Sequence, residues 1–253
     1  MKKKIALITG ATSGIGEATT RRLADNGFDV IITGRRSDRL TNLKGELEKN
    51  GTRVLDLCFD VRVESEVKSA VENLPDSWKD IDVLVNNAGL AAGLSALQEG
   101  DTDDWNRMID TNVKGLLYVT RYVSPLMIER GKGHIINMGS IAGKEVYPNG
   151  NVYCATKHAV DALTKGMRID MLRHNIKVTQ VCPGAVETEF SVVRFHGDEV
   201  RAAKVYEGFD NLIAEDIADC ILFAISRPDH VNINDMTVMP TAQATGTIFN
   251  KKP

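Results

Sequence analysis

Thr9-Gly10-Ala11-Thr12-Ser13-Gly14-Ile15-Gly16 is the stretch that decides the fold of this chain. The apolar run Lys4–Thr9 leads into it and the amphipathic pattern Gly16–Asn26 follows, so it connects a predicted strand to a predicted helix. Its three glycines allow a tight turn and let a pyrophosphate approach the backbone. The helix N-terminus then supplies free N–H groups and the positive end of a dipole.

The glycine spacing of this loop leaves two interpretations open. It is Gly-x3-Gly-x-Gly, whereas the usual dinucleotide fingerprint is Gly-x-Gly-x-x-Gly. One interpretation is a glycine-rich turn without a ligand, and the other is a phosphate site, which the place of the loop after the first strand favours. The residues expected to contact cofactor phosphates are Gly10, Thr12, Ser13, Gly14, Ile15 and Gly16.

Strand-like and helix-like segments alternate along the rest of the chain. The predicted strands are Lys4–Thr9, Asp29–Thr33, Arg53–Phe59, Asp82–Asn86, His134–Met138, Lys177–Cys182 and Met236–Met239. The predicted helices are Gly16–Asn26, Arg39–Asn50, Glu64–Leu74, Asp103–Arg130, Val152–His174 and Glu215–Ser226. This alternation predicts an α/β fold of the Rossmann type: a doubly wound parallel sheet of about seven strands with helices on both faces.

The domain organisation follows from what interrupts this alternation. We see no linker rich in Pro and Ser and no repeat, so we predict a single domain over residues 1–253. Residues 186–208 break the rhythm, are mixed in character and contain Gly197. Long insertions after a strand of such a sheet often form lids. We therefore expect a substrate lid in this segment.

The composition is that of an ordinary globular protein. The 253 residues are 43% hydrophobic and 26% charged, and the net charge is −3, which gives no reason to expect nucleic acid or an anionic membrane as a partner. No run approaches the roughly 18 apolar residues of a membrane helix. The apolar stretch after Lys2–Lys4 is too short for a signal-peptide core, so we expect a cytoplasmic protein.

The four cysteines, Cys58, Cys154, Cys182 and Cys220, lack CxxC spacing. Three of them lie within or beside predicted strands or the helix Val152–His174. We interpret all four as reduced core residues of a cytosolic protein rather than as disulfide partners, and we expect no metal site.

A possible proton-transfer group lies in the second half of the chain. Tyr153 and Lys157 are four residues apart and therefore share one face of a predicted helix. An ammonium beside a phenol favours the phenolate and lowers the tyrosine pKa from about 10, as acid–base catalysis near neutral pH requires. Ser140, at a strand end, could donate a hydrogen bond to a substrate oxygen. Taken alone, such a pair is more often a solvated helix face.

Three further strand ends carry residues suited to a dinucleotide. Gly34 is followed by Arg35 and Arg36, which suit a 2′-phosphate because guanidinium binds phosphate bidentately. Two solvated loop arginines are the alternative. The other residues expected to contact the cofactor are Asp60 and Val61 at the adenine, and Asn87, Ala88 and Gly89 in a loop of small residues.

These residues together resemble the short-chain dehydrogenase/reductase family over nearly the whole chain. The matching motifs are Thr9–Gly16, Asn86–Gly89, Asn112, Ser140, Tyr153, Lys157 and Pro183-Gly184. The chain is most similar to the NADP-dependent 3-hydroxy acid dehydrogenases, also called serine or allo-threonine dehydrogenases. The stretches that carry this second resemblance are Thr33–Arg36, Met108–Asn112, Gly133–Asn137, Glu189–Ser191, Val193–Phe195 and His230–Asn234.

The resemblance implies a role for each matching residue. Tyr153 would exchange a proton with the substrate oxygen, Lys157 would lower the tyrosine pKa and hold the nicotinamide ribose, and Ser140 would polarise the carbonyl. Asn112, in the middle of the predicted helix Asp103–Arg130, would anchor a water of the proton relay. Further cofactor contacts are implied at Pro183, Gly184, Val186 and Thr188, with NADP as the cofactor.

The resemblance implies that the substrate is a small hydroxy acid or the corresponding carbonyl compound. Arg194 stands alone in the otherwise apolar run Val192–Phe195, so we predict that it binds a substrate carboxylate; a surface arginine on a mobile loop is the alternative. Substrate side chains could also touch Lys144, Glu145 and Tyr147. The rival functions are a generic carbonyl or 3-oxoacyl carrier-protein reductase and a non-catalytic NADP sensor, although sensors typically lose the tyrosine or lysine.

The resemblance also implies a homotetramer, in which two long helices pair across a two-fold axis. The helices concerned are Asp103–Arg130 and Val152–His174, which stay apolar in their outer halves. The tail Thr241–Pro253 is apolar enough to reach a neighbouring subunit. The alternative is that these apolar faces are fully used within one chain.

Overall fold

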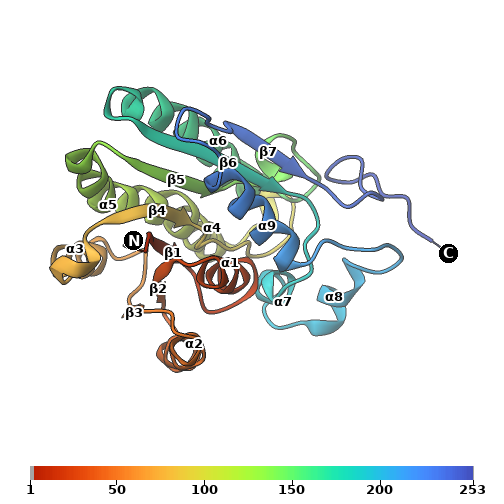
Figure 1. The fold of residues 1–253 in the computed structure, drawn as a ribbon. Coiled ribbons are helices and arrows are strands. Elements are labelled where there is room, and N and C mark those ends of the chain that lie inside the picture. Colours follow the sequence, from red (N-terminus) through yellow and green to blue (C-terminus); the bar gives the residue numbers. More distant parts are fainter. Residues whose placement is uncertain (1–2, 253) are drawn as a thin grey trace.

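A computed structural model describes residues 3–252 and contains one parallel sheet of seven strands in the order β3-β2-β1-β4-β5-β6-β7 (Figure 1). The strands are β1 (Ile5–Thr9), β2 (Asp29–Gly34), β3 (Val54–Cys58), β4 (Ile81–Asn86), β5 (Gly133–Met138), β6 (Ile176–Pro183) and β7 (Asp235–Val238). This confirms the predicted Rossmann-type sheet. The strand order reverses between β1 and β4, and ligands bind at such a switch point in open α/β sheets.

Helices cover both faces of the sheet (Figure 1). They are α1 (Gly14–Asp25), α2 (Ser37–Lys49), α3 (Glu64–Glu72), α4 (Thr102–Ile109), α5 (Leu116–Arg130), α6 (Asn151–Met171), α7 (Phe190–Arg194), α8 (Glu199–Lys204) and α9 (Ala214–Ile225). Helices α1, α2 and α9 pack on one face, and α3, α5 and α6 pack on the other. Short 3₁₀ turns cover Asp76–Trp78, Leu97–Glu99, Ile141–Gly143 and Leu172–His174.

The continuous apolar runs of the sequence form strands that are buried on both sides. In β1, Ala6 and Ile8 belong to the core beneath α1 and α9, whereas Ile5 and Leu7 belong to the core beneath α3 and α5. This follows from the two-residue period of a strand. Each fully buried Ile or Leu side chain of this strand contributes about 1.5–3 kcal/mol. The sheet is thus held from both sides, and its strand ends form a stable platform.

The single helix predicted over Asp103–Arg130 is not continuous. Helix α4 ends at Ile109, a π-helical turn follows over Asp110–Gly115, and α5 begins at Leu116. A π turn inserts an extra residue into the helical repeat and is frequent at functional sites. Asn112, a poor helix former, lies inside this turn.

The segment predicted to be a lid lies beyond the carboxyl ends of the strands (Figure 1). We call residues 186–208, which contain α7 and α8, the lid segment. A parallel bridge between Val186 and Leu212 closes its base. In the C-terminal tail, the Phe249 ring lies 4.9 Å from that of Phe209 in the same chain, and the expected contact with a neighbouring subunit stays a prediction. Pro253 lies outside the described residues.

The cysteine prediction is partly wrong. All four thiols are free, and Cys154 and Cys182 are buried. Cys58, however, is exposed and Cys220 is only half-buried. The reason is position: Cys58 ends the edge strand β3, and Cys220 is not among the residues that α9 buries.

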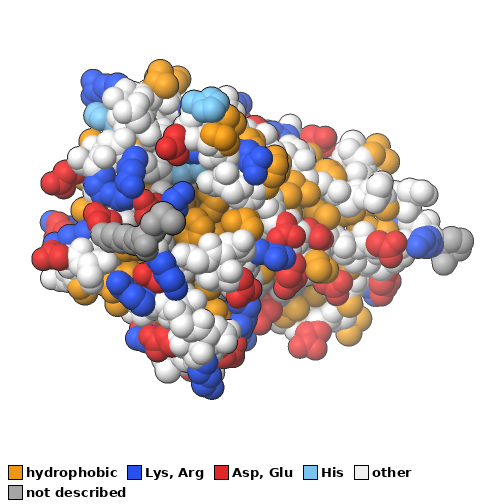
Figure 2. All heavy atoms as spheres, in the orientation of Figure 1, with side chains coloured by type: hydrophobic (Ala, Val, Ile, Leu, Met, Phe, Trp, Pro, Cys, Tyr) orange, Lys and Arg blue, Asp and Glu red, His pale blue; other side chains and the backbone are white. Residues whose placement is uncertain are grey.

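The surface shows acidic and basic side chains interspersed over the face seen in Figure 2. Across residues 3–252, no helix is both long enough and apolar enough to cross a membrane. No cluster of three or more His, Cys, Asp or Glu side chains suited to a metal ion occurs in the same residues.

Candidate active site

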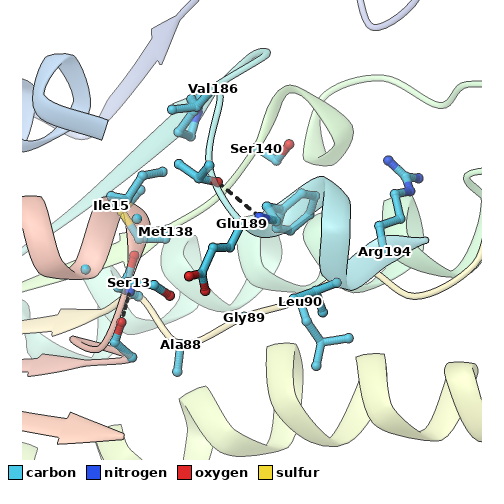
Figure 3. Close-up of a pocket in the computed structure, with 18 of the residues that line it drawn as sticks. Ser13, Ile15, Ala88, Gly89, Leu90, Met138, Ser140, Val186, Glu189 and Arg194 are labelled. Atoms are coloured by element: carbon cyan, nitrogen blue, oxygen red, sulfur yellow. Dashed lines mark hydrogen bonds between the residues drawn. The ribbon is translucent and has the colours of Figure 1, made fainter. Parts of the chain in front are cut away.

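A cavity of about 520 Å³ opens at the carboxyl ends of the strands, within the size range of small-molecule sites (Figure 3). Almost every residue that the sequence predicted for the site lines it. From the phosphate loop and the following strands these are Gly10, Thr12, Ser13, Gly14, Ile15, Gly16, Arg35, Arg36, Asp60, Val61, Asn87, Ala88 and Gly89. From the second half of the chain they are Ser140, Tyr153, Lys157, Pro183, Gly184, Val186, Thr188 and Arg194.

Hydrogen bonds with the loop after β4 fix the conformation of the glycine loop. The Asn87 amide nitrogen donates to the carbonyls of Thr9 (2.9 Å) and Gly10 (3.2 Å), and the Thr9 hydroxyl accepts from the backbone of Asn87. A Cβ at Gly16 would lie 2.2 Å from the Gly10 carbonyl oxygen, so only glycine fits there. Helix α1 begins at Gly14, which places its free N–H groups at the cavity.

Arg36 lies against the glycine loop, although 40% of its side-chain surface is exposed. Its guanidinium donates to the Ser13 hydroxyl at 2.8 Å and to the Thr12 hydroxyl at 2.9 Å. Arg39, which the sequence analysis missed, lies beside it and binds the same acidic side chain, Glu189. The spacing i, i+3 at the start of α2 was the available signal for Arg39. Arg35 is 58% exposed, with Asp60 3.7 Å away.

Asp60 lines the cavity where the adenine is expected. Burial alone would raise the pKa of its carboxyl, but hydrogen bonds and the charge of Arg62 hold that pKa below its usual range. The two Arg62 contacts with Asp60 Oδ2 are 2.6 and 2.9 Å. Asp60 is therefore an ionised, fixed acceptor.

Tyr153, Lys157 and Ser140 come together in the cavity, because α6 runs past the end of β5. The Lys157 ammonium donates to the carbonyl of Met138 at 2.8 Å and lies 6.0 Å from the centre of the Tyr153 ring. Burial lowers the pKa of Lys157 to about 8. The trio is therefore buried beside the cavity and is not a solvated helix face.

The expected lowering of the Tyr153 pKa is not present in this structure. Burial raises that pKa, as does the neighbouring Tyr147, whereas a hydrogen bond with Ser140 and the charge of Arg194 oppose the rise. Lys157 is bound to the backbone instead of the phenol. The expectation followed from helical spacing, which fixes a shared face but not the direction of a long side chain.

Asn112 does not itself line the cavity, and its expected role as the anchor of a relay water stays a prediction. It is 2% exposed, and its side-chain oxygen accepts from the backbone N–H of Leu90 at 2.8 Å. Its amide nitrogen donates to the Leu90 carbonyl at 2.8 Å and to Thr156 Oγ1 at 3.0 Å. The side chain therefore ties the loop after β4 to α6, behind the wall that holds Tyr153.

Arg194 lies at the end of the cavity away from the glycine loop (Figure 3). Its guanidinium carbon is 5.5 Å from the centre of the Tyr153 ring, and Nη2 donates to the Tyr147 hydroxyl at 2.8 Å. Tyr147 lines the cavity, but Lys144 binds Asp161 and Asp235 and does not.

Glu145 accepts a hydrogen bond from the backbone N–H of Gly246 and likewise does not line the cavity. His158 Nδ1 lies 2.9 Å from the carbonyl oxygen of Cys154 within α6.

Several lining residues were not predicted. Phe190 packs edge-on against the Tyr153 ring at 5.7 Å, and Glu189 binds Arg36 and Arg39. The C-terminal tail adds Gln243, Gly246 and Phe249. No sequence pattern marks the tail residues, because they reach the cavity only through contacts with distant segments, such as the hydrogen bond that Gln243 Oε1 accepts from the backbone N–H of Ala185.

The residues present fit a phosphorylated dinucleotide. The glycine loop and the start of α1 supply N–H donors, and Arg36 and Arg39 already bind a carboxylate, which is an anion like a phosphate. Lys157 and Tyr153 lie further along the same cavity. The cavity thus has an anion site at one end and a proton-transfer group at the other.

Known proteins agree with this arrangement. Residues 4–198 match the family model described as short chain dehydrogenase. The chain belongs to the short-chain dehydrogenase family. It is 48% identical to an NADP-dependent 3-hydroxy acid dehydrogenase, YdfG, of Salmonella typhi, over 95% of this chain and 96% of that protein.

Two further relatives lie at a similar distance. A sulfoacetaldehyde reductase 2 from Chromohalobacter salexigens is 46% identical, with 95% of each chain covered. The closed form of a serine dehydrogenase complexed with NADP⁺ superposes with a TM-score of 0.93 at 44% identity, covering 98% of this chain and all of the other.

Proposed function

We propose that this short-chain dehydrogenase is an NADP-dependent oxidoreductase that interconverts small 3-hydroxy acids and their carbonyl forms. Serine, allo-threonine and 3-hydroxybutyrate represent the substrate class. The observation that carries the substrate class is the Arg194 guanidinium, 5.5 Å from the Tyr153 ring at the substrate end of the cavity. Support for the reaction and for NADP comes from the relatives named above.

The cofactor site is proposed along the cavity from the glycine loop to Lys157. The loop and the start of α1 would hold the pyrophosphate, Arg35 and Arg36 the 2′-phosphate, and Asp60 with Val61 the adenine. Further lining residues proposed to contact the cofactor are Asn87, Ala88, Gly89, Pro183, Gly184, Val186 and Thr188. When bound, NADP supplies hydride transfer, and the protein positions the reactants and handles the proton.

Tyr153 is proposed to transfer the proton to and from the substrate oxygen. Its hydroxyl would give a proton to the substrate oxygen during reduction and take it back during oxidation, while Ser140 donates a second hydrogen bond to that oxygen. Lys157 would need to turn from the Met138 carbonyl toward the tyrosine and the cofactor ribose, and its charge would then favour the phenolate. Asn112 acts by positioning, because it fixes the loop after β4 against α6.

Arg194 is proposed to bind the substrate carboxylate. A carboxylate there would accept charge-assisted hydrogen bonds from the guanidinium, and Tyr147 Oη would steady the arginine. This places the charged end of the substrate opposite Tyr153, with the reacting carbon between them. A generic carbonyl reductase or a 3-oxoacyl carrier-protein reductase has no need of a cation at this place.

A second candidate substrate is a sulfonated aldehyde. Arg194 would bind a sulfonate as it binds a carboxylate, and the 46% identical relative is named as a sulfoacetaldehyde reductase.

We propose further that the chain acts in the cytoplasm as one domain, with residues 186–208 as its lid, and assembles as a homotetramer through α5 and α6. The exposed apolar residues Ile169, near the end of α6, and Leu172, in the turn that follows α6, support this assembly.

One substrate panel tests the proposal. Initial rates are measured with NADP⁺ and with NAD⁺ for serine, allo-threonine, 3-hydroxybutyrate and simple secondary alcohols, and in the reverse direction with sulfoacetaldehyde. We expect kcat/KM to favour NADP⁺ and the substrates that carry a carboxylate or a sulfonate. A preference for uncharged alcohols would refute the substrate class, and a preference for NAD⁺ would refute the phosphate role of Arg35 and Arg36. Cofactor binding without turnover of any compound would indicate a sensor.

A further inference from the structure

Glu189 places a carboxylate on the arginines that the 2′-phosphate needs. Its Oε1 lies 2.7 Å from Arg39 Nη1, and its Oε2 lies 3.0 Å from Arg36 Nη1. Hydrogen bonds from Arg39 and then Arg36 lower the pKa of Glu189, so the carboxylate is ionised at neutral pH. The arginines and the glutamate are 150 and 153 residues apart in sequence, so the lid segment brings its own anion to the start of α2.

The route of this side chain is visible in Figure 3. Glu189 begins just before α7 and points toward Ser13 of the glycine loop, whereas Arg194 lies at the other end of the cavity. Glu189 itself lines the cavity, as do Arg36 and Ser13. The carboxylate thus lies inside the cofactor site and is not an ion pair on a remote surface.

Arg36 has little freedom to serve a second anion without giving up the first. Its Nη2 is engaged by Ser13 and Thr12, and its Nη1 by Glu189. Arg39 Nη1 serves Glu189 and, at 3.4 Å, the Thr12 carbonyl. A phosphate that approaches Arg36 meets donors already in use, and at either arginine it meets the like charge of Glu189.

We infer that Glu189 is a specificity-determining residue that competes with the 2′-phosphate of NADP for Arg36 and Arg39. The inference rests on the proposed phosphate role of the arginines. A phosphate dianion carries more charge and more acceptors than a carboxylate, so it displaces Glu189, at a cost in affinity. NAD has a hydroxyl at this position and leaves the Glu189 pair intact. Glu189 therefore lowers the affinity for NADP but not that for NAD, and so reduces the preference of the protein for NADP.

The test measures binding without turnover. Calorimetry compares adenosine 2′,5′-bisphosphate with 5′-AMP, and NADP⁺ with NAD⁺, on the full chain and on Glu189→Gln. We expect the variant to bind the two 2′-phosphorylated ligands about fivefold more tightly, as loss of one exposed charge interaction implies, with 5′-AMP and NAD⁺ unchanged. Glu187→Gln is the matched control, because Glu187 is exposed on the same segment and forms no ion pair with either arginine among the described residues.

Two other results would overturn the inference. Unchanged affinity would mean that Glu189 does not compete, and weaker binding of the 2′-phosphorylated ligands would mean that it holds the arginines in place for the cofactor. The variant Arg36→Ala tests separately whether Arg36 binds the 2′-phosphate at all. If that variant loses affinity for adenosine 2′,5′-bisphosphate but not for 5′-AMP, the site stands. If the variant keeps its affinity for both ligands, the proposed phosphate site and the inference are both refuted.

Discussion

Replacing Arg194 with alanine removes the one group that the substrate proposal depends on. The guanidinium donates to Tyr147 Oη at 2.8 Å and to the Gly93 carbonyl at 3.4 Å, and it faces the Tyr153 ring. A hydrogen bond to a charged group contributes about 1.5–3 kcal/mol. We therefore expect kcat/KM for serine or 3-hydroxybutyrate to fall about 10- to 150-fold, mainly through KM.

The assay must separate substrate binding from an effect on the tyrosine. The charge of Arg194 also lowers the pKa of Tyr153, so its loss changes the acid–base group for every substrate. The informative quantity is therefore the ratio of kcat/KM for the hydroxy acid to that for a simple secondary alcohol, measured at saturating NADP⁺. This ratio should fall by the full factor in Arg194→Ala and partly recover in Arg194→Lys, which restores the charge without the planar fork.

Arg201→Ala is the matched control, because this second arginine of the lid segment lies over the Phe195 ring at 4.3 Å and does not line the cavity. It should leave the ratio unchanged. An equal loss of kcat/KM on the hydroxy acid and the alcohol in Arg194→Ala would refute the carboxylate role, and would assign Arg194 to the tyrosine or to lid stability instead.

Lys157 and two glycines give the remaining predictions. Burial lowers the pKa of Lys157 to about 8 from about 10.5, so the unfolded chain binds more protons between these values and stability should rise with pH across that window. Urea unfolding at pH 8 and pH 10 should show a gain of up to about 1.4 kcal/mol per pH unit that Lys157→Met lacks; identical slopes would disprove it. Gly16→Ala should abolish NADP⁺ binding and lower Tm by several degrees, because its Cβ meets the Gly10 carbonyl at 2.2 Å. Gly45→Ala, with nothing within 4 Å of its Cβ, should instead stabilise α2 by about 0.5–1 kcal/mol, and a Gly16→Ala variant that binds normally would contradict the clash.

Local patterns predicted the sheet well because they act within a few residues. The apolar runs gave all seven strands to within a few residues, and the glycine loop gave the start of α1. The boundary between α4 and α5 was missed, because a π turn changes the helical repeat without changing the composition. Cys58 was misplaced because its strand lies at the edge of the sheet, and strand order is not a local property.

By itself, the sequence determined which strand ends carry donors, acids and bases, since parallel strands bring their carboxyl ends to one edge. It therefore predicted the phosphate loop, the trio around Tyr153 and the arginines after β2 as neighbours. Only the tertiary structure decided how their charges pair. Lys157 donates a hydrogen bond to the Met138 carbonyl, and the Asn112 side chain is hydrogen-bonded to Leu90 and Thr156. Glu189 forms an ion pair with Arg36, which is far from it in sequence. The physical reason is that burial and ion pairing depend on side chains from distant segments, whose directions no local spacing fixes.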